Sequence, residues 1–252
     1  MLLSGRNQPL AELSLAEGFD ALHRAGADAV ELCHEHPAMS PEKASPEQAA
    51  GVAEMLADAG IRASAVGWHC DYVLDDANYE RLPELIALTP LYGTDVFITA
   101  CVKSGEGAWE RALERTGVLC EAAEQAGVRL AIEYEPNFLV EDSASLLRLV
   151  KEVGSDALAA NLDLGHAFLM EDDPAEGIRS LGDRIAHCHV EGMAEGTHKH
   201  LLPWEGDLPL EDCFSVLQEV GFDGALALDL YGVDYAAVAP KCFDYLRGLL
   251  PG

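Results

Sequence analysis

The stretch AWERALERTGVLCEAAEQAGVRLAI (residues 108–132) contains the structural unit from which the fold is predicted. Residues 108–125 form the longest predicted helix, Gly127 ends it, and the apolar, β-branched VRLAI (128–132) is a strand. The same order of helix, glycine and strand recurs at Gly26, Gly60 and Gly221. Helices and strands therefore alternate along the chain.

This alternation predicts eight strand–helix units. Strands are expected at 28–33, 61–66, 95–100, 128–132, 158–162, 185–190 and 225–230, with a weak eighth at 1–4. Helices are expected at 16–25, 46–59, 78–88, 108–125, 144–153, 174–181, 210–220 and 235–249. A regular alternation implies a parallel sheet, and eight units that close on themselves make a (β/α)8 TIM barrel. An open doubly wound sheet is the alternative, but no glycine-rich phosphate-binding motif follows the first strand.

The composition excludes several classes of partner. The 252 residues include 44 acidic and 16 basic side chains, a formal charge of −28. Nucleic acids and anionic membranes repel such a protein unless it concentrates its cations, and no Lys/Arg run does so. No composition break divides the chain, so residues 1–252 are predicted to form a single domain. No uncharged run reaches 18 residues, the N-terminus lacks the apolar core of a secretory signal, and the seven cysteines are scattered, so a cytoplasmic protein is expected.

Polar residues gather where the predicted strands end. These residues are Glu31, His34, His36, His69, Glu133, Glu135, Asp163, His166, His187, His189 and Asp229. In a TIM barrel the carboxyl ends of the strands carry the function. Three carboxylates and a histidine at one depth suit a divalent metal, and without a cation the carboxylates would repel one another. Each residue also has a structural alternative, such as a rim ion pair, a turn or a helix cap.

Five segments carry a resemblance to a known family. They are LAIE (130–133), NLDLGH (161–166), HCHVEG (187–192), HLLPWEGDLPL (200–210) and FDGALALDL (222–230). Together they resemble the xylose-isomerase-like TIM-barrel family of sugar and sugar-phosphate isomerases and epimerases, inosose-processing enzymes and apurinic endonucleases. The resemblance implies one divalent metal ion (Mn, Mg, Co or Zn), and its ligands would be Glu133, Asp163, His189 and Asp229.

The resemblance also implies a reaction. It is a metal-dependent isomerisation or epimerisation of a small sugar or polyol ketone by proton transfer through a metal-stabilised ene-diolate. The catalytic residues would be Glu133, Asp229 and His166, and the substrate-binding residues His69, Glu135, His166, His200 and Trp204. Asp229 stands where the family usually has Glu. Trp204 replaces a glycine of the usual PGEG turn, and it is expected to wall the pocket or stack on a substrate ring.

Other functions stay open at this point. A lyase or dehydratase acting on an inosose or keto-acid would use the same metal site. An endonuclease would need extra zinc near His69, His166 and the 198–200 segment, but the histidine expected at the end of the fourth strand (100–103) is absent. A non-catalytic barrel is a further alternative. Arg6, Lys103 and Lys199 are the candidates for binding a phosphate, although a neutral substrate is favoured. The resemblance further suggests a homodimer or homotetramer.

Overall fold

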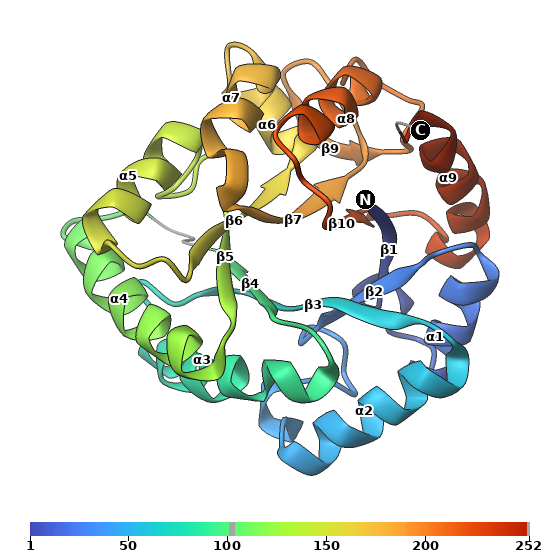
Figure 1. Ribbon diagram of the computed structural model, residues 1–252, viewed down its shortest axis with the longest axis horizontal. Helices are drawn as coiled ribbons and strands as arrows, with labels where there is room; N and C mark the ends of the chain where they lie inside the picture. Colours follow the sequence, from blue (N-terminus) through green and yellow to red (C-terminus); the bar gives the residue numbers. More distant parts are fainter. Residues whose placement is uncertain (101–103, 251–252) are drawn as a thin grey trace.

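In the computed structural model, which describes residues 1–100 and 104–250, eight parallel strands close into a barrel (Figure 1). The order of the strands around the barrel is β1-β10-β7-β6-β5-β4-β3-β2. Their bounds are Leu2–Arg6 (β1), Ala29–Cys33 (β2), Arg62–Asp71 (β3), Val96–Ala100 (β4), Arg129–Glu133 (β5), Leu158–Asp163 (β6), Ile185–Val190 (β7) and Ala225–Leu228 (β10). The TIM barrel is thus confirmed, including the weak first strand, and the open sheet is excluded.

The helices surround the barrel, as Figure 1 shows. Their bounds are Leu15–Arg24 (α1), Pro46–Ala59 (α2), Asp76–Leu88 (α3), Ala108–Ala126 (α4), Ser143–Val153 (α5), Leu164–Met170 (α6), Pro174–Leu181 (α7), Leu210–Glu219 (α8) and Tyr235–Leu249 (α9). The bounds of α2 match the prediction, because Ser45 caps the Gln48 N–H and Gly60 takes the left-handed conformation (φ +70°) that ends the helix. Of the described helices, none is both long and apolar enough to cross a membrane.

Two features depart from the sequence prediction. Helix α6 follows β6 directly, because the Asp163 side chain accepts a hydrogen bond from the His166 N–H and caps it. A two-stranded antiparallel hairpin, β8 (Gly192–Ala194) and β9 (Thr197–Leu201), follows β7. Helix α6 and the two hairpin strands are short, and β9 is largely exposed. None of the three therefore shows the apolar periodicity that marks a longer helix or a buried strand.

The core has two parts. A large apolar cluster lies between the barrel and its helices, and small aliphatic side chains fill a second cluster. The members of the second cluster are Ala65, Val96, Ile98, Ala131, Ala159 and Ala186. The described cysteines are buried and free, as expected for structural thiols, and Cys101 lies outside the described residues. The carboxylates Glu133, Asp163 and Asp229 lie at the carboxyl ends of their strands.

Candidate active site at the carboxyl end of the barrel

Charged side chains from six strands meet at this end of the barrel. Glu133 and Asp163 are the last residues of β5 and β6, and Asp163 is the register partner of His189 on β7. Arg6 ends β1, Glu31 lies in β2 and Asp229 directly follows β10. Each of these side chains is buried, with an exposed fraction of 4% or less.

The imidazole of His189 lies at the centre of the predicted metal ligands. Its Nδ1 is 3.2 Å from Glu133 Oε2, 3.8 Å from Asp163 Oδ2 and 3.7 Å from Asp229 Oδ2. Its Nε2 is 2.8 Å from Glu31 Oε2, on the opposite side of the ring. The structure therefore brings the four predicted ligands to one point, and it adds Glu31 behind the histidine.

The chemistry of this donor set fits a divalent metal ion. Asp163 Oδ2 is fully buried and has no hydrogen-bond partner among the described residues. A carboxylate behind a metal-binding histidine fixes its tautomer, and Glu31 occupies that position relative to His189. Several of these side chains also belong to clusters whose spacing would suit an ion. The arrangement can thus hold a cation through three carboxylates and one imidazole.

Without a metal ion, bound protons must offset the negative charge of the buried carboxylates. Burial alone would lower the pKa of His189, but Glu133 and Glu31 raise it well above its ordinary value. Burial would raise the pKa of Glu133, but His189 and His69 hold it well below the usual range. Burial, together with Asp163 and Asp229, raises the pKa of Glu191 well above its ordinary value. A bound metal would have to displace the proton of His189.

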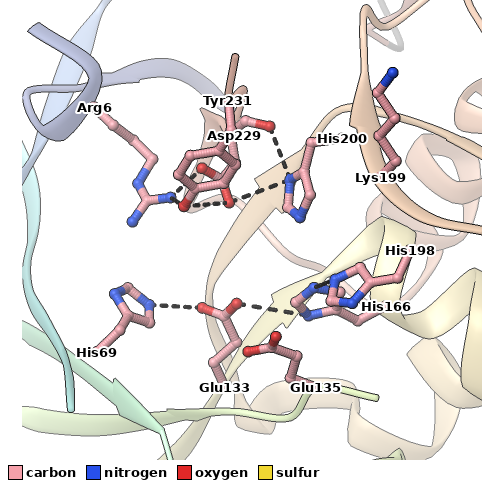
Figure 2. Close-up of a pocket in the computed structure, with 10 residues that line it drawn as sticks. All are labelled: Arg6, His69, Glu133, Glu135, His166, His198, Lys199, His200, Asp229 and Tyr231. Carbon is pink, nitrogen blue, oxygen red and sulfur yellow. Dashed lines mark hydrogen bonds and ion pairs between the residues drawn. The ribbon is translucent and has the colours of Figure 1, made fainter. Parts of the chain in front are cut away.

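A cavity of about 420 Å³ opens beside these residues (Figure 2). Its lining residues are Arg6, His69, Glu133, Glu135, His166, His198, Lys199, His200, Asp229 and Tyr231. Figure 2 shows Glu133 and Asp229 on opposite sides of the cavity. Of the predicted substrate-binding residues, His69, Glu135, His166 and His200 line it. Lys103, a candidate for binding phosphate, lies outside the described residues.

The structure does not place Trp204 at the cavity, so the expectation that it walls the pocket is wrong here. Its ring packs edge-on against Tyr245, with the ring centroids 5.8 Å apart, and Lys241 Nζ lies 4.0 Å from its centroid. Both partners belong to α9. The turn after β9 thus directs the indole toward the outer helix layer, a direction that the PWEG motif alone does not encode.

Three histidines meet at the cavity mouth, and the unpredicted hairpin supplies two of them. His166 Nδ1 lies 3.0 Å from the Tyr134 carbonyl, and His166 Nε2 lies 2.9 Å from His198 Nε2. His200 Nδ1 lies 3.0 Å from the Asp229 carbonyl. Since a carbonyl only accepts, both Nδ1 atoms carry the proton. The Nε2 of a neutral His200 is then available as an acceptor, whereas the Nε2 of His166 faces His198.

Sequence reasoning gave Arg6 and Tyr231 no role in the acidic cluster. Arg6 donates from Nε to Glu31 Oε1 at 3.2 Å, and from Nη1 to Asp229 and to the Tyr231 hydroxyl. Arg6 was considered only for binding a phosphate. It ends β1, whose predicted range stopped at residue 4, so a strand two residues longer would have placed it among the strand-end residues.

His69 lies between two carboxylates. Its Nε2 is 2.9 Å from Glu133 Oε2, and its Nδ1 is 3.6 Å from Glu35 Oε1. The backbone N–H of His69 also donates a hydrogen bond to the Glu35 carboxylate. Burial would lower the pKa of His69, but Glu133 and then Glu35 raise it to about 10. In the metal-free protein His69 is therefore a cation at neutral pH.

We expect NMR titration of the metal-free protein to show His69 protonated above pH 8. Glu133→Gln should lower the pKa of His69 more than Glu35→Gln does, because Glu133 contributes the larger attraction. The measurement is the pH dependence of the imidazole carbon shifts in the two variants and the wild type. A His69 that titrates near the ordinary value of about 6.5 in the wild type would contradict the ion pair.

Comparison with known proteins agrees with this architecture. The family model described as xylose isomerase-like TIM barrel matches residues 19–247. Fructoselysine 3-epimerase of Escherichia coli O157:H7 is 27% identical over 150 residues, which cover 57% of this chain and 54% of the relative. Inosose dehydratase of Lacticaseibacillus casei is 26% identical over 141 residues, which cover 48% of this chain and 46% of the relative. The chain thus spans about half the length of the curated relatives it matches.

A solved structure extends the likeness over the whole fold. The crystal structure of a probable 3-DHS dehydratase from Bacillus anthracis superposes with a TM-score of 0.84, covering 98% of this chain and 99% of that one. The sequence identity is 18%, so this likeness concerns the fold alone.

Proposed function

Since the chain belongs to the xylose isomerase-like TIM-barrel family, we propose that it is a divalent-metal-dependent isomerase or epimerase of a small sugar or polyol ketone. One observation carries the proposal. Three buried carboxylates converge on His189 Nδ1 beside a cavity large enough for a small sugar. The relation to a sugar 3-epimerase supports the same reaction type.

In this proposal Glu133, Asp163, His189 and Asp229 bind the metal. A divalent ion at that point would polarise a substrate carbonyl and make the adjacent C–H more acidic. Glu133 is ionised and lines the cavity, so it removes that proton and the substrate becomes an ene-diolate. Return of a proton to the neighbouring carbon isomerises the sugar, and return to the opposite face epimerises it.

The other cavity residues have supporting roles. Asp229 faces Glu133 across the cavity, which places it to deliver a proton from the opposite side of the substrate. His200 offers Nε2 to a substrate hydroxyl, and His166 would offer its Nε2 once a hydroxyl replaces the contact with His198. His69 lines the same cavity and could donate a hydrogen bond to an oxygen that develops negative charge. Glu135 lines the same wall as Glu133 and is a second candidate base.

The test combines metal analysis with isotope exchange. The protein, stripped with a chelator and reloaded with Mn²⁺, Mg²⁺, Co²⁺ or Zn²⁺, would be incubated in D₂O with ketoses, inososes and hydroxy-keto acids. We expect turnover only in loaded protein, with deuterium on a carbon of a product that is otherwise an isomer of the substrate. Absence of both turnover and deuterium exchange over the panel would contradict the proposal.

A dehydratase is the second candidate, because an inosose dehydratase is among the relatives. The same base would act, but the substrate would then expel a hydroxyl group next to the enolate. Mass spectrometry of the product distinguishes the two reactions, since dehydration removes one water.

A further inference from the structure

A row of hydrogen-bonded, buried polar side chains crosses the barrel interior and reaches Glu133. Such interiors are normally filled by branched aliphatic side chains. Here Asn161 on β6, His187 on β7 and Ser4 on β1 are fully buried, and Ser64 on β3 joins them. Burying polar groups in an apolar interior costs free energy unless they are hydrogen-bonded, so their partners indicate what they do.

From Ser64 through His187 and Asn161, each hydrogen bond is donated in the direction of Glu133. A carboxylate only accepts, so the Asn161 amide must donate Nδ2–H to Glu133 Oε2, at 2.6 Å. Asn161 Oδ1 then faces His187 and accepts Nδ1–H at 2.9 Å. The other ring nitrogen, Nε2, is left to accept from the Ser64 hydroxyl at 3.3 Å. Ser64 in turn lies 2.8 Å from the Ser4 hydroxyl, whose oxygen is also 3.1 Å from the Gly5 carbonyl oxygen.

The strand register fixes this row in place. Glu133 and Asn161 are direct partners across β5 and β6, and Asn161 and His187 are partners across β6 and β7. The three side chains therefore lie at one depth on neighbouring strands. His187 holds the Asn161 amide from its other end, because the bond from Nδ1–H to Asn161 Oδ1 fixes the plane in which Nδ2–H meets the Glu133 carboxylate.

We propose that Asn161 and His187 are positioning residues that hold the Glu133 carboxylate in its working orientation. The inference rests on the proposed function, in which Glu133 binds the metal and transfers the proton. The row does not conduct protons itself, since passing one through the Asn161 amide would require a high-energy imidic acid. Its role is to keep a neutral donor on Glu133 Oε2, the oxygen that also faces His189 and His69.

Two variants of equal size test the role of His187. His187→Asn keeps an amide N–H near the position of Nδ1. The leucine of His187→Leu has nearly the same shape as asparagine, but it cannot donate a hydrogen bond to Asn161. We expect His187→Leu to lower kcat by about 10- to 100-fold with little change in KM, as for other residues that orient a metal ligand. His187→Asn should restore most of the loss. Thermal unfolding of both variants shows whether the fold is kept. Asn161→Leu is a second variant, which interrupts the row of hydrogen bonds at Asn161.

Two further readouts need no substrate. Chelator competition on the stripped protein should show that His187→Leu weakens metal binding by about 10- to 100-fold, while His187→Asn does not. In metal-free protein the downfield NMR signal of the His69 Nε2–H bonded to Glu133 should persist in His187→Asn and shift or vanish in His187→Leu.

The outcomes separate this inference from the proposed function. If the wild type turns over no substrate but the two variants differ in metal affinity and in the His69 signal, the positioning role stands and the assigned reaction is wrong. If the Asn and Leu variants match each other in kcat, metal affinity and the His69 signal, His187 only fills space and the inference is overturned.

Discussion

Glu133→Gln is expected to lower kcat by about 10²- to 10⁴-fold, the usual contribution of a general base. The amide keeps the shape of the side chain, but it cannot accept the substrate proton and is a poor metal ligand. The neighbouring donors His69 and His189 keep the Glu133 carboxylate ionised, so the wild type has a ready acceptor that the variant lacks. Steady-state kinetics and deuterium exchange at the substrate carbon measure the loss.

Glu135→Gln is the matched control. Glu135 lines the same cavity, but burial and the nearby Glu133 raise its pKa, although His166 opposes the shift. It also makes no contact with His189 comparable to the 3.2 Å approach of Glu133. We therefore expect a much smaller loss for Glu135→Gln. A larger loss in this variant would reassign the proton acceptor to Glu135.

The fold could be predicted because its signals are local and repeated. Each helix ends at a glycine or turn before an apolar strand, and at Ser45 and Gly60 the caps fixed both ends of α2. Helix α6 is short and begins at a single cap, the Asp163 side chain, and the strands of the β8–β9 hairpin are short, with β9 largely exposed. Neither element has a periodic apolar pattern, so the sequence does not predict them.

The site could be predicted in part for a similar reason. Parallel strands bring their carboxyl ends to one edge, so Glu133, Asp163 and Asp229 were expected near one another, and the structure places them around His189. The directions of long side chains are not encoded in strand spacing. Trp204 turns outward to α9, and Arg6 reaches across to a residue that lies 223 positions later in the chain.

Arg6→Met is expected to lower the free energy of unfolding by about 3–5 kcal/mol, the range found when one partner of a buried ion pair is removed. Arg6 is 1% exposed and donates to both Glu31 and Asp229, which are buried as well. Methionine fills part of the space but leaves two carboxylates without their cation. Urea unfolding of the metal-free protein at neutral pH measures the difference. Arg6→Lys keeps the positive charge, but its ammonium group cannot reproduce the contacts of the guanidinium with both Glu31 and Asp229. We expect it to lose less unfolding free energy than Arg6→Met.

The pH dependence of this loss separates charge from packing. Burial would raise the pKa of Glu31, but Arg6 and then His189 hold it well below its ordinary value. A lowered folded-state pKa contributes stability that is present above the unfolded pKa and lost as pH falls through the folded pKa. Without Arg6 the pKa of Glu31 is held down mainly by His189, so the variant lacks the part of this contribution that Arg6 supplies. The difference between wild type and Arg6→Met should therefore be largest near pH 7 and begin to shrink below about pH 4, where Glu31 becomes protonated in the unfolded chain. It should go on shrinking as the pH falls further, toward the lowered pKa of Glu31 in the folded wild type. A difference that stays constant over this range would mean that Arg6 stabilises the barrel by filling space, and that the acidic cluster does not depend on its charge.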